Sequence, residues 1–140
     1  YILASDKAKF VSAYTASGLT PDGSSTYFLA KHVGLLRAKE LFLSNRMLSA
    51  EEAKQWGFVT EVVAYDKLAT KANELAIQLA SGPTKAYGGV KRMLLSSFSS
   101  PIESQLDNET RHIVGTMDTH DGPHGLNAFL NKERPRFTGS

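Results

Sequence analysis

The feature of this sequence that most constrains its fold is the helical spacing of apolar residues after Asp66. Five of them recur every three or four positions: Leu68, Ala72, Leu75, Ala76 and Leu79. Such spacing places side chains along one side of a helix, and that side must be covered by other protein surface. Asp66 is the expected N-cap and Gly82-Pro83 the stop. We therefore predict an amphipathic helix that packs within the chain or against a neighbouring subunit.

Further amphipathic helices are predicted in the same half of the chain. Tyr87, Val90 and Leu94 form the next apolar stripe. Ser100-Pro101-Ile102-Glu103 has the pattern of a capping box with proline at the first helical position. The helix that follows is lined by four apolar residues: Ile102, Leu106, Ile113 and Met117. A short last helix is expected over residues 126–130, and Pro135 is expected to end regular structure, so residues 66–140 are predicted to form three or four amphipathic helices.

The first 65 residues predict a mixture of strands and helices. We expect strands over residues 1–4, 10–14 and 58–64, and helices over residues 24–33, 35–43 and 49–57. Gly34 and Gly57 are typical helix stops, and residues 18–23 have the composition of a loop. Ser49-Ala50-Glu51-Glu52 is a second predicted capping box. The chain is therefore expected to be α/β, with a division near Tyr65.

Composition excludes several function classes. The net charge of +2 comes from scattered Lys and Arg, so no nucleic-acid partner is expected. No apolar run approaches the roughly 20 residues that span a bilayer, so no membrane partner is expected. The absence of cysteine excludes disulfides and thiolate zinc sites and suits a reducing cytoplasm. His120 and His124 lack the regular helix that would direct both rings at one ion, so no metal site is predicted.

Six segments in order resemble the enoyl-CoA hydratase/isomerase, or crotonase, family: residues 4–10, 18–23, 33–41, 48–59, 79–83 and 128–134. The resemblance implies the C-terminal half of a crotonase-like (ClpP/crotonase β-spiral) α/β fold. Residues 1–65 would complete the spiral core, and residues 66–140 would form a helical oligomerisation region that assembles homotrimers or dimers of trimers. The substrate would be an acyl-CoA, with no cofactor beyond its coenzyme A moiety.

The chain opens in the apolar, strand-like run Tyr1-Ile2-Leu3-Ala4 without an initiator Met, so we expect a missing first half. The resemblance implies that both oxyanion-hole N–H donors lie in that half. Enzymes of this family form an enolate from a thioester, which requires such donors as charge develops on the carbonyl oxygen. We therefore expect the 140 residues alone to be inactive.

Tyr14 stands where the resemblance places the second carboxylate of a hydratase. A phenol with a pKa of about 10 is a poor substitute for a carboxylate near neutral pH, so this departure disfavours hydration. As a substrate-binding residue, Tyr14 would form a wall of the acyl pocket. The alternative is an inward aromatic side chain that serves packing alone.

Asp22 matches the position of the working aspartate in isomerase-type members and in aryl-CoA dehalogenases. A single carboxylate can take a proton from one carbon and return it two carbons away, which is the chemistry of a double-bond isomerase. The alternative is an N-cap, since Asp22 directly precedes the predicted helix and aspartate is a favoured cap. The two roles are compatible, and both stay open at this point.

Phe129 and Lys132 match family positions where the last helix reaches coenzyme A. Lys132 would bind a phosphate as a point charge. The alternatives are core packing for Phe129 and a solvated surface position for Lys132. The leading functional hypothesis is an enoyl-CoA isomerase that uses Asp22. The alternatives are an enoyl-CoA hydratase that uses upstream residues, an aryl-CoA dehalogenase, and a non-catalytic oligomerisation fragment.

Overall fold

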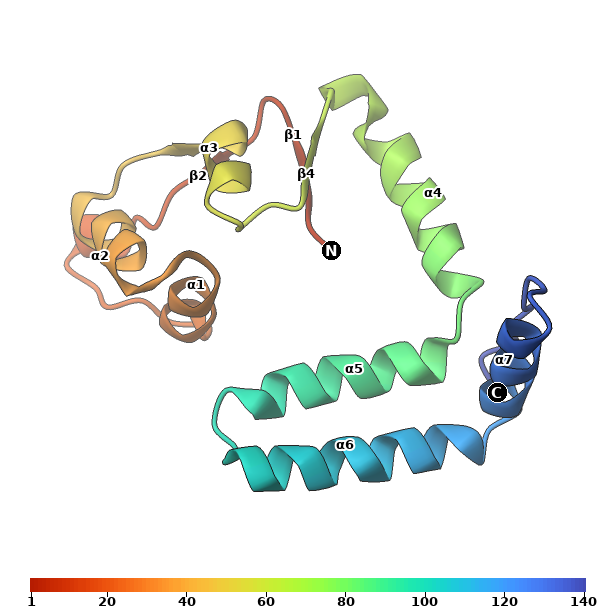
Figure 1. Ribbon diagram of the computed structural model, residues 1–140. Coiled ribbons are helices and arrows are strands. Elements are labelled where there is room, and N and C mark those ends of the chain that lie inside the picture. The colour runs from red at the N-terminus through yellow and green to blue at the C-terminus, as the bar shows by residue number, and fades with distance from the viewer. The chain divides into compact units, whose positions relative to one another are not determined.

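A computed structural model describes residues 1–140 as two compact units, Tyr1–Asn73 and Glu74–Ser140 (Figure 1). The first contains β1 (Leu3–Ser5), β2 (Lys9–Phe10), η1 (Thr15–Ser17), α1 (Ser25–Val33), α2 (Leu35–Ser44), β3 (Leu48–Ser49), α3 (Ala50–Gln55), β4 (Glu61–Val63) and η2 (Tyr65–Lys67). Helix α4 (Leu68–Ala80) spans the division. The second contains α5 (Thr84–Ser97), α6 (Ile102–Met117) and α7 (Asp121–Leu130). The roles assigned to residues 1–65 and 66–140 stay predictions.

The strands of the first unit form two small sheets. β1 pairs in parallel with β4, and β2 pairs antiparallel with β3. The turn after β1 is held by Asp6, whose carboxylate accepts a hydrogen bond from the backbone N–H of Tyr65 at 3.0 Å. This bond fixes the end of β1 to the segment that leaves β4.

The core of the first unit is built from small and branched apolar side chains. One cluster of buried residues lies between the sheets and α2 and α3: Ala4, Leu41, Leu48, Ala50, Ala53 and Val59. A second cluster, Val33, Ala38 and Phe42, joins α1 to α2. Gly34 is the single residue between α1 and α2. Its φ of +83° is a conformation that favours glycine. The predicted helices over residues 24–33 and 35–43 are confirmed to within one residue.

The strand predicted over residues 10–14 is wrong beyond Phe10. There the chain leaves its partner β3, and Tyr14 takes a helical conformation that opens the short 3-10 helix η1. The Thr15 hydroxyl donates to the carbonyl of Phe42 at the end of α2. Long-range hydrogen bonding to α2 therefore overrides the local preference for a strand.

The predicted helix caps are only partly confirmed. Ser49 caps α3, and its Oγ accepts from the Glu52 N–H at 3.2 Å. The Glu52 carboxylate instead binds Arg46, with Arg46 Nη2 and Glu52 Oε1 2.7 Å apart, and this hydrogen bond lowers the pKa of Glu52. Asp66 lies inside η2 rather than capping α4, and the N-cap of α6 is Pro101, without a side-chain cap.

The second unit is organised by a helical hairpin of α5 and α6, which run side by side (Figure 1). The buried amide of Gln105 cross-links them: its Nε2 donates to the Met93 carbonyl at 3.2 Å, and its Oε1 accepts from the Ser96 hydroxyl at 3.0 Å. Such a satisfied buried amide fixes how the two helices pack. No helix has the length and apolar character that crossing a bilayer requires.

Helix α7 begins at Asp121, five residues before the predicted start at Leu126. It runs through Pro123, which the first helical turn tolerates because its N–H groups have no intrahelical partner. The premise that no regular helix surrounds His124 was therefore wrong. The rings of His120 and His124 stack with centroids 5.8 Å apart. His124 Nε2 accepts a hydrogen bond from the backbone N–H of Arg136.

Asp121 holds the C-terminal residues against the start of α7. Its buried carboxylate accepts from the backbone N–H groups of Thr138 and Gly139, at 2.9 and 2.8 Å, and from the Thr138 hydroxyl. The Thr138 N–H contributes most to lowering the pKa of Asp121 from 3.8 to about 2, and burial opposes this shift. The charged carboxylate is therefore what these hydrogen bonds stabilise.

We expect acid to release this C-terminal segment. Because the folded-state pKa of Asp121 is depressed, its stabilising contribution is present above pH 3.8 and is lost as pH falls through about 2. Amide chemical shifts of Thr138 and Gly139 should follow that titration. At pH 7, Asp121→Asn should speed hydrogen exchange at both amides by roughly tenfold, since charge-assisted hydrogen bonds are lost. Asp118→Asn, at an exposed residue, is the control. Equal exchange in both variants would contradict the role of Asp121 in holding the C-terminal segment.

Candidate active site

Asp22 lies on the loop that leads into α1. Its carbonyl accepts hydrogen bonds from the Ser25 N–H at 3.0 Å and the Ser25 hydroxyl at 2.7 Å. Its carboxylate is exposed and makes no hydrogen bond or ion pair. The N-cap of α1 is Ser24, and Gly23 and Ser24 are both left-handed, at φ +59° and +65°. The capping alternative for Asp22 is therefore wrong, because these two residues turn the chain before the helix starts.

An apolar cleft of about 580 Å³ adjoins the same helix. Helix α1 and the segment that begins with β2 supply most of its lining, together with residues of the core: Ile2, Lys9, Phe10, Val11, Ser12, Ser25, Phe28, Leu29, His32, Leu41, Leu48 and Phe58. Phe10 and Phe58 meet edge to face, with ring centroids 5.1 Å apart. The size and the apolar lining are typical of small-molecule sites.

Tyr14 and Asp22 lie on the segment between β2 and α1, outside the lining of the apolar cleft. Tyr14 is half-buried, and its carbonyl accepts from the N–H groups of Ser17 and Leu19 at 3.0 Å. Neither Tyr14 nor Asp22 lines the apolar cleft. The proposed acyl wall and the proposed base therefore lie on the same segment, and the apolar cleft is formed without either of them.

Phe129 and Lys132 lie at the end of α7 in the second unit. The Phe129 side chain is 77% exposed, so core packing within this chain does not explain it. Its carbonyl accepts from the Lys132 N–H at 3.1 Å, and Lys132 is left-handed at φ +58°. Both side chains are accessible to a ligand or to another chain.

His32 is a polar residue of the cleft that the sequence analysis missed. It follows Ser25 by seven positions on α1, and Phe28 and Leu29 fall between them at helical spacing. That spacing was the available signal, since such residues share one side of a helix. His32 and Ser25 thus place two polar groups on an otherwise apolar wall.

The short paired strands, the helix pair α1–α2 and the C-terminal helices define an α/β protein of crotonase-like fold. The family model described as enoyl-CoA hydratase/isomerase matches residues 1–140. The chain therefore belongs to the enoyl-CoA hydratase/isomerase family, and the resemblance found in its sequence is confirmed.

Proteins of known description support the same conclusion. The chain is 38% identical over 138 residues to 1,2-epoxyphenylacetyl-CoA isomerase of Escherichia coli K12, covering 99% of this chain and 53% of that protein. It is 34% identical over 128 residues to 4-chlorobenzoyl coenzyme A dehalogenase-1 of Arthrobacter, covering 91% and 46%. The crystal structure of an enoyl-CoA hydratase/isomerase from Cupriavidus metallidurans superposes with a TM-score of 0.91 at 36% identity, covering 98% and 52%. The chain thus spans about half the length of these relatives.

Proposed function

We propose that the protein, as part of a complete family fold, shifts a C=C bond in an acyl-CoA or aryl-acetyl-CoA. Asp22 would be the base that moves the proton. The observation that supports this proposal is the match of Asp22 to the position of the working aspartate in isomerase-type members, and its carboxylate is exposed and without a hydrogen-bond partner on the loop before α1. A carboxylate with no structural partner is free to meet a substrate.

The proposed reaction has two proton transfers by one group. The Asp22 carboxylate takes a proton from one acyl carbon, and the electron pair moves into the thioester carbonyl to form an enolate. The protonated Asp22 then returns the proton two carbons away. Backbone N–H donors must stabilise the enolate oxygen, and losing one such donor costs on the order of 10²–10³ in rate. In the family those donors lie outside the segments that this chain resembles.

Hydration and dehalogenation are the alternatives within the family. Tyr14 disfavours hydration, because a hydratase uses two carboxylates around a water molecule. The likeness to the Arthrobacter dehalogenase supports dehalogenation as an alternative. There the Asp22 oxygen would attack the aromatic carbon, halide would leave, and water would then hydrolyse the ester. Three readouts separate the reactions: deuterium exchange into the acyl chain, labelled water oxygen in the product, and halide release.

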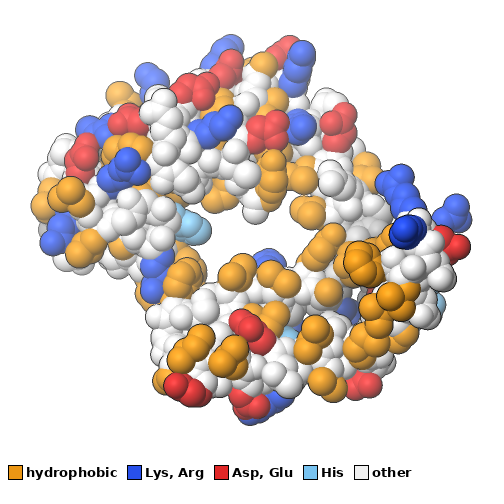
Figure 2. Space-filling model, in the orientation of Figure 1, with side chains coloured by type: hydrophobic (Ala, Val, Ile, Leu, Met, Phe, Trp, Pro, Cys, Tyr) orange, Lys and Arg blue, Asp and Glu red, His pale blue; other side chains and the backbone are white.

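We also propose that the second unit assembles homotrimers or dimers of trimers. Large apolar side chains lie exposed on its helices, and Figure 2 shows such side chains on the surface of α5, α6 and α7. Six of those on α5, α6 and α7 are at least 57% exposed: Leu94, Ile102, Ile113, Val114, Phe129 and Leu130. Many large apolar side chains exposed on one set of helices are typical of interaction sites. In the alternative of a non-catalytic fragment, this assembly would be the whole function.

The 140-residue chain alone is expected to catalyse no isomerisation above the rate in buffer. Its residues include the proposed base but not the family's oxyanion-hole donors. The measurement is deuterium exchange from an enoyl-CoA, with a complete family isomerase as positive control. If the chain alone catalyses the reaction and Asp22→Asn abolishes it, the reaction does not need the oxyanion-hole donors of the complete family fold.

A further inference from the structure

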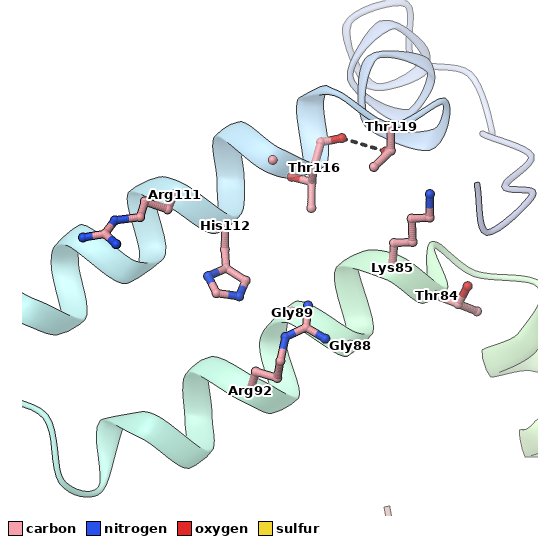
Figure 3. Close-up of a pocket in the computed structure, with 10 residues that line it drawn as sticks. Thr84, Lys85, Gly88, Gly89, Arg92, Arg111, His112, Thr116 and Thr119 are labelled. Carbon is pink, nitrogen blue, oxygen red and sulfur yellow. Dashed lines mark hydrogen bonds between the residues drawn. The ribbon is translucent and has the colours of Figure 1, made fainter.

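A second cleft, distinct from the apolar one, opens between α5 and α6 and has a volume of about 520 Å³ (Figure 3). Its lining comes from both helices and the residues just after α6: Thr84, Lys85, Gly88, Gly89, Arg92, Arg111, His112, Gly115, Thr116 and Thr119. Three of these residues are cationic, and none carries a carboxylate. We call this the basic cleft.

The cations of the basic cleft are poorly neutralised within the chain. Lys85 and Arg92 make no hydrogen bond or ion pair. Arg111 pairs with Asp107 one turn away, but both side chains are exposed. Exposed pairs of this kind contribute little and are screened by salt. A concave surface lined by one sign of charge focuses its field and attracts counter-ions.

Two adjacent glycines in the middle of α5 shape the basic cleft. A Cβ on Gly89 would lie 3.4 Å from Cδ2 of His112, and one on Gly88 would lie 3.6 Å from Nη1 of Arg92. An alanine methyl at either position would make ordinary van der Waals contact, so the imidazole ring packs close to the α5 backbone at Gly89 and the guanidinium lies beside Gly88 (Figure 3).

His112 presents one unused nitrogen in the basic cleft. Its Nδ1 lies 2.9 Å from the Asn108 carbonyl, which can only accept, so Nδ1 carries the hydrogen. Nε2 has no partner. The Gln105 cross-link between α5 and α6 fixes the two walls before any ligand arrives. The helix walls of the cleft are thus fixed in advance, and the exposed side chains of Lys85 and Arg92 supply its charge.

We propose that the basic cleft binds a small molecule that carries more than one phosphate. Lys85 and Arg92 stand seven positions apart on α5, which is about 10 Å along a helix and places them on the same side. Because both side chains are long, their cationic ends can converge on adjacent phosphates, and two cations match the charge of a diphosphate better than that of a single phosphate. The guanidinium of Arg92 can bind phosphate oxygens in bidentate fashion, and Lys85 acts as a point charge. The proposal goes beyond the isomerase function and does not require it.

A second groove between α5 and α6 differs from the basic cleft in its lining. It is lined mainly by apolar residues of the same two helices: Ala86, Val90, Met93, Leu106 and Ile113. Gly89, His112 and Thr116 line both grooves and so mark the line where the helices meet. The hairpin therefore has one basic groove and one mainly apolar groove, whose lining includes Glu109 and no Lys or Arg, so only the basic groove offers cations to a phosphate.

The test is a titration of the full chain with inorganic pyrophosphate, followed by calorimetry and by the amide signals of Gly88, Gly89 and Gly115. We expect saturable binding that weakens with added salt. The double variant Lys85→Gln/Arg92→Gln should raise the dissociation constant by roughly tenfold or more, because charge-assisted hydrogen bonds are lost. Lys91→Gln, an exposed cation of α5 outside the cleft, is the matched control and should leave binding unchanged.

Coenzyme A in a second arm distinguishes the source of the phosphates. If the double variant weakens pyrophosphate and coenzyme A alike, the cleft accepts the diphosphate of the coenzyme; if it weakens pyrophosphate alone, the ligand is a separate polyphosphate. Lys132→Gln, which tests the proposed coenzyme A contact, should not alter pyrophosphate binding. Absence of saturable pyrophosphate binding, or equal loss in the double variant and in Lys91→Gln, would overturn the proposal.

Discussion

Asp22→Asn is expected to reduce deuterium exchange into the acyl chain of a bound enoyl-CoA by roughly 10²- to 10⁴-fold, the usual contribution of a general base. The protein for this measurement is the complete family fold that contains this chain. An asparagine has the shape of aspartate, but its amide cannot accept the proton. Substrate binding should change little, so the effect is expected in kcat rather than in KM.

The structure indicates that Asp22→Asn should remove the proposed base without changing the stability of the fold. Because the Asp22 carboxylate has no hydrogen bond or ion pair, replacing it should change the free energy of unfolding by no more than about 0.5 kcal/mol. Asp66→Asn is the matched control, since Asp66 is also exposed, lies in the same unit and is assigned no chemistry. Exchange at the wild-type rate in the Asp22→Asn variant would remove Asp22 from the mechanism, whatever its position in the loop.

The helices that were predicted best from the sequence are those that end at a residue with a positive φ. Gly34 separates α1 from α2, and left-handed Asn45 ends α2, so both helices were found nearly as observed. The strands were less predictable. β2 ends at Phe10, opposite the first residue of its antiparallel partner β3, and Thr15 then hydrogen-bonds to α2. No local sequence pattern predicts this end. Pairing partners far along the chain set the ends of short strands.

The candidate sites show the same difference between local and tertiary information. Asp22 was correctly placed just before α1, but its capping role depended on the exact conformation of Gly23 and Ser24. The basic cleft was missed altogether. Lys85 and Arg92 on one helix, and His112 on another, come together only through the packing of α5 against α6. Sequence spacing shows which residues share one helix face, but not which face meets another helix.

Leu48→Ala is expected to have the largest effect on the stability of the first unit. Leu48 is fully buried, and it lies on β3 opposite Phe10 in the core shared with Leu41 and Val59. Its truncation should lower the free energy of unfolding by about 2–5 kcal/mol, because the apolar transfer energy is lost and a cavity remains. Chemical denaturation measured by circular dichroism gives this quantity.

Two further variants separate packing from other causes. Leu48→Met nearly conserves volume and should lose less than about 1.5 kcal/mol, whereas Leu36→Ala removes a side chain that is 82% exposed and should change the free energy by about 0.5 kcal/mol or less. Equal losses for Leu48→Ala and Leu36→Ala would mean that Leu48 is not the centre of this core. The α1 side of the apolar cleft depends on the same packing, since Leu29 contacts this core and lines the cleft. A loss at Leu48 should therefore also weaken any ligand binding in the apolar cleft, while leaving pyrophosphate binding in the basic cleft of the second unit unchanged.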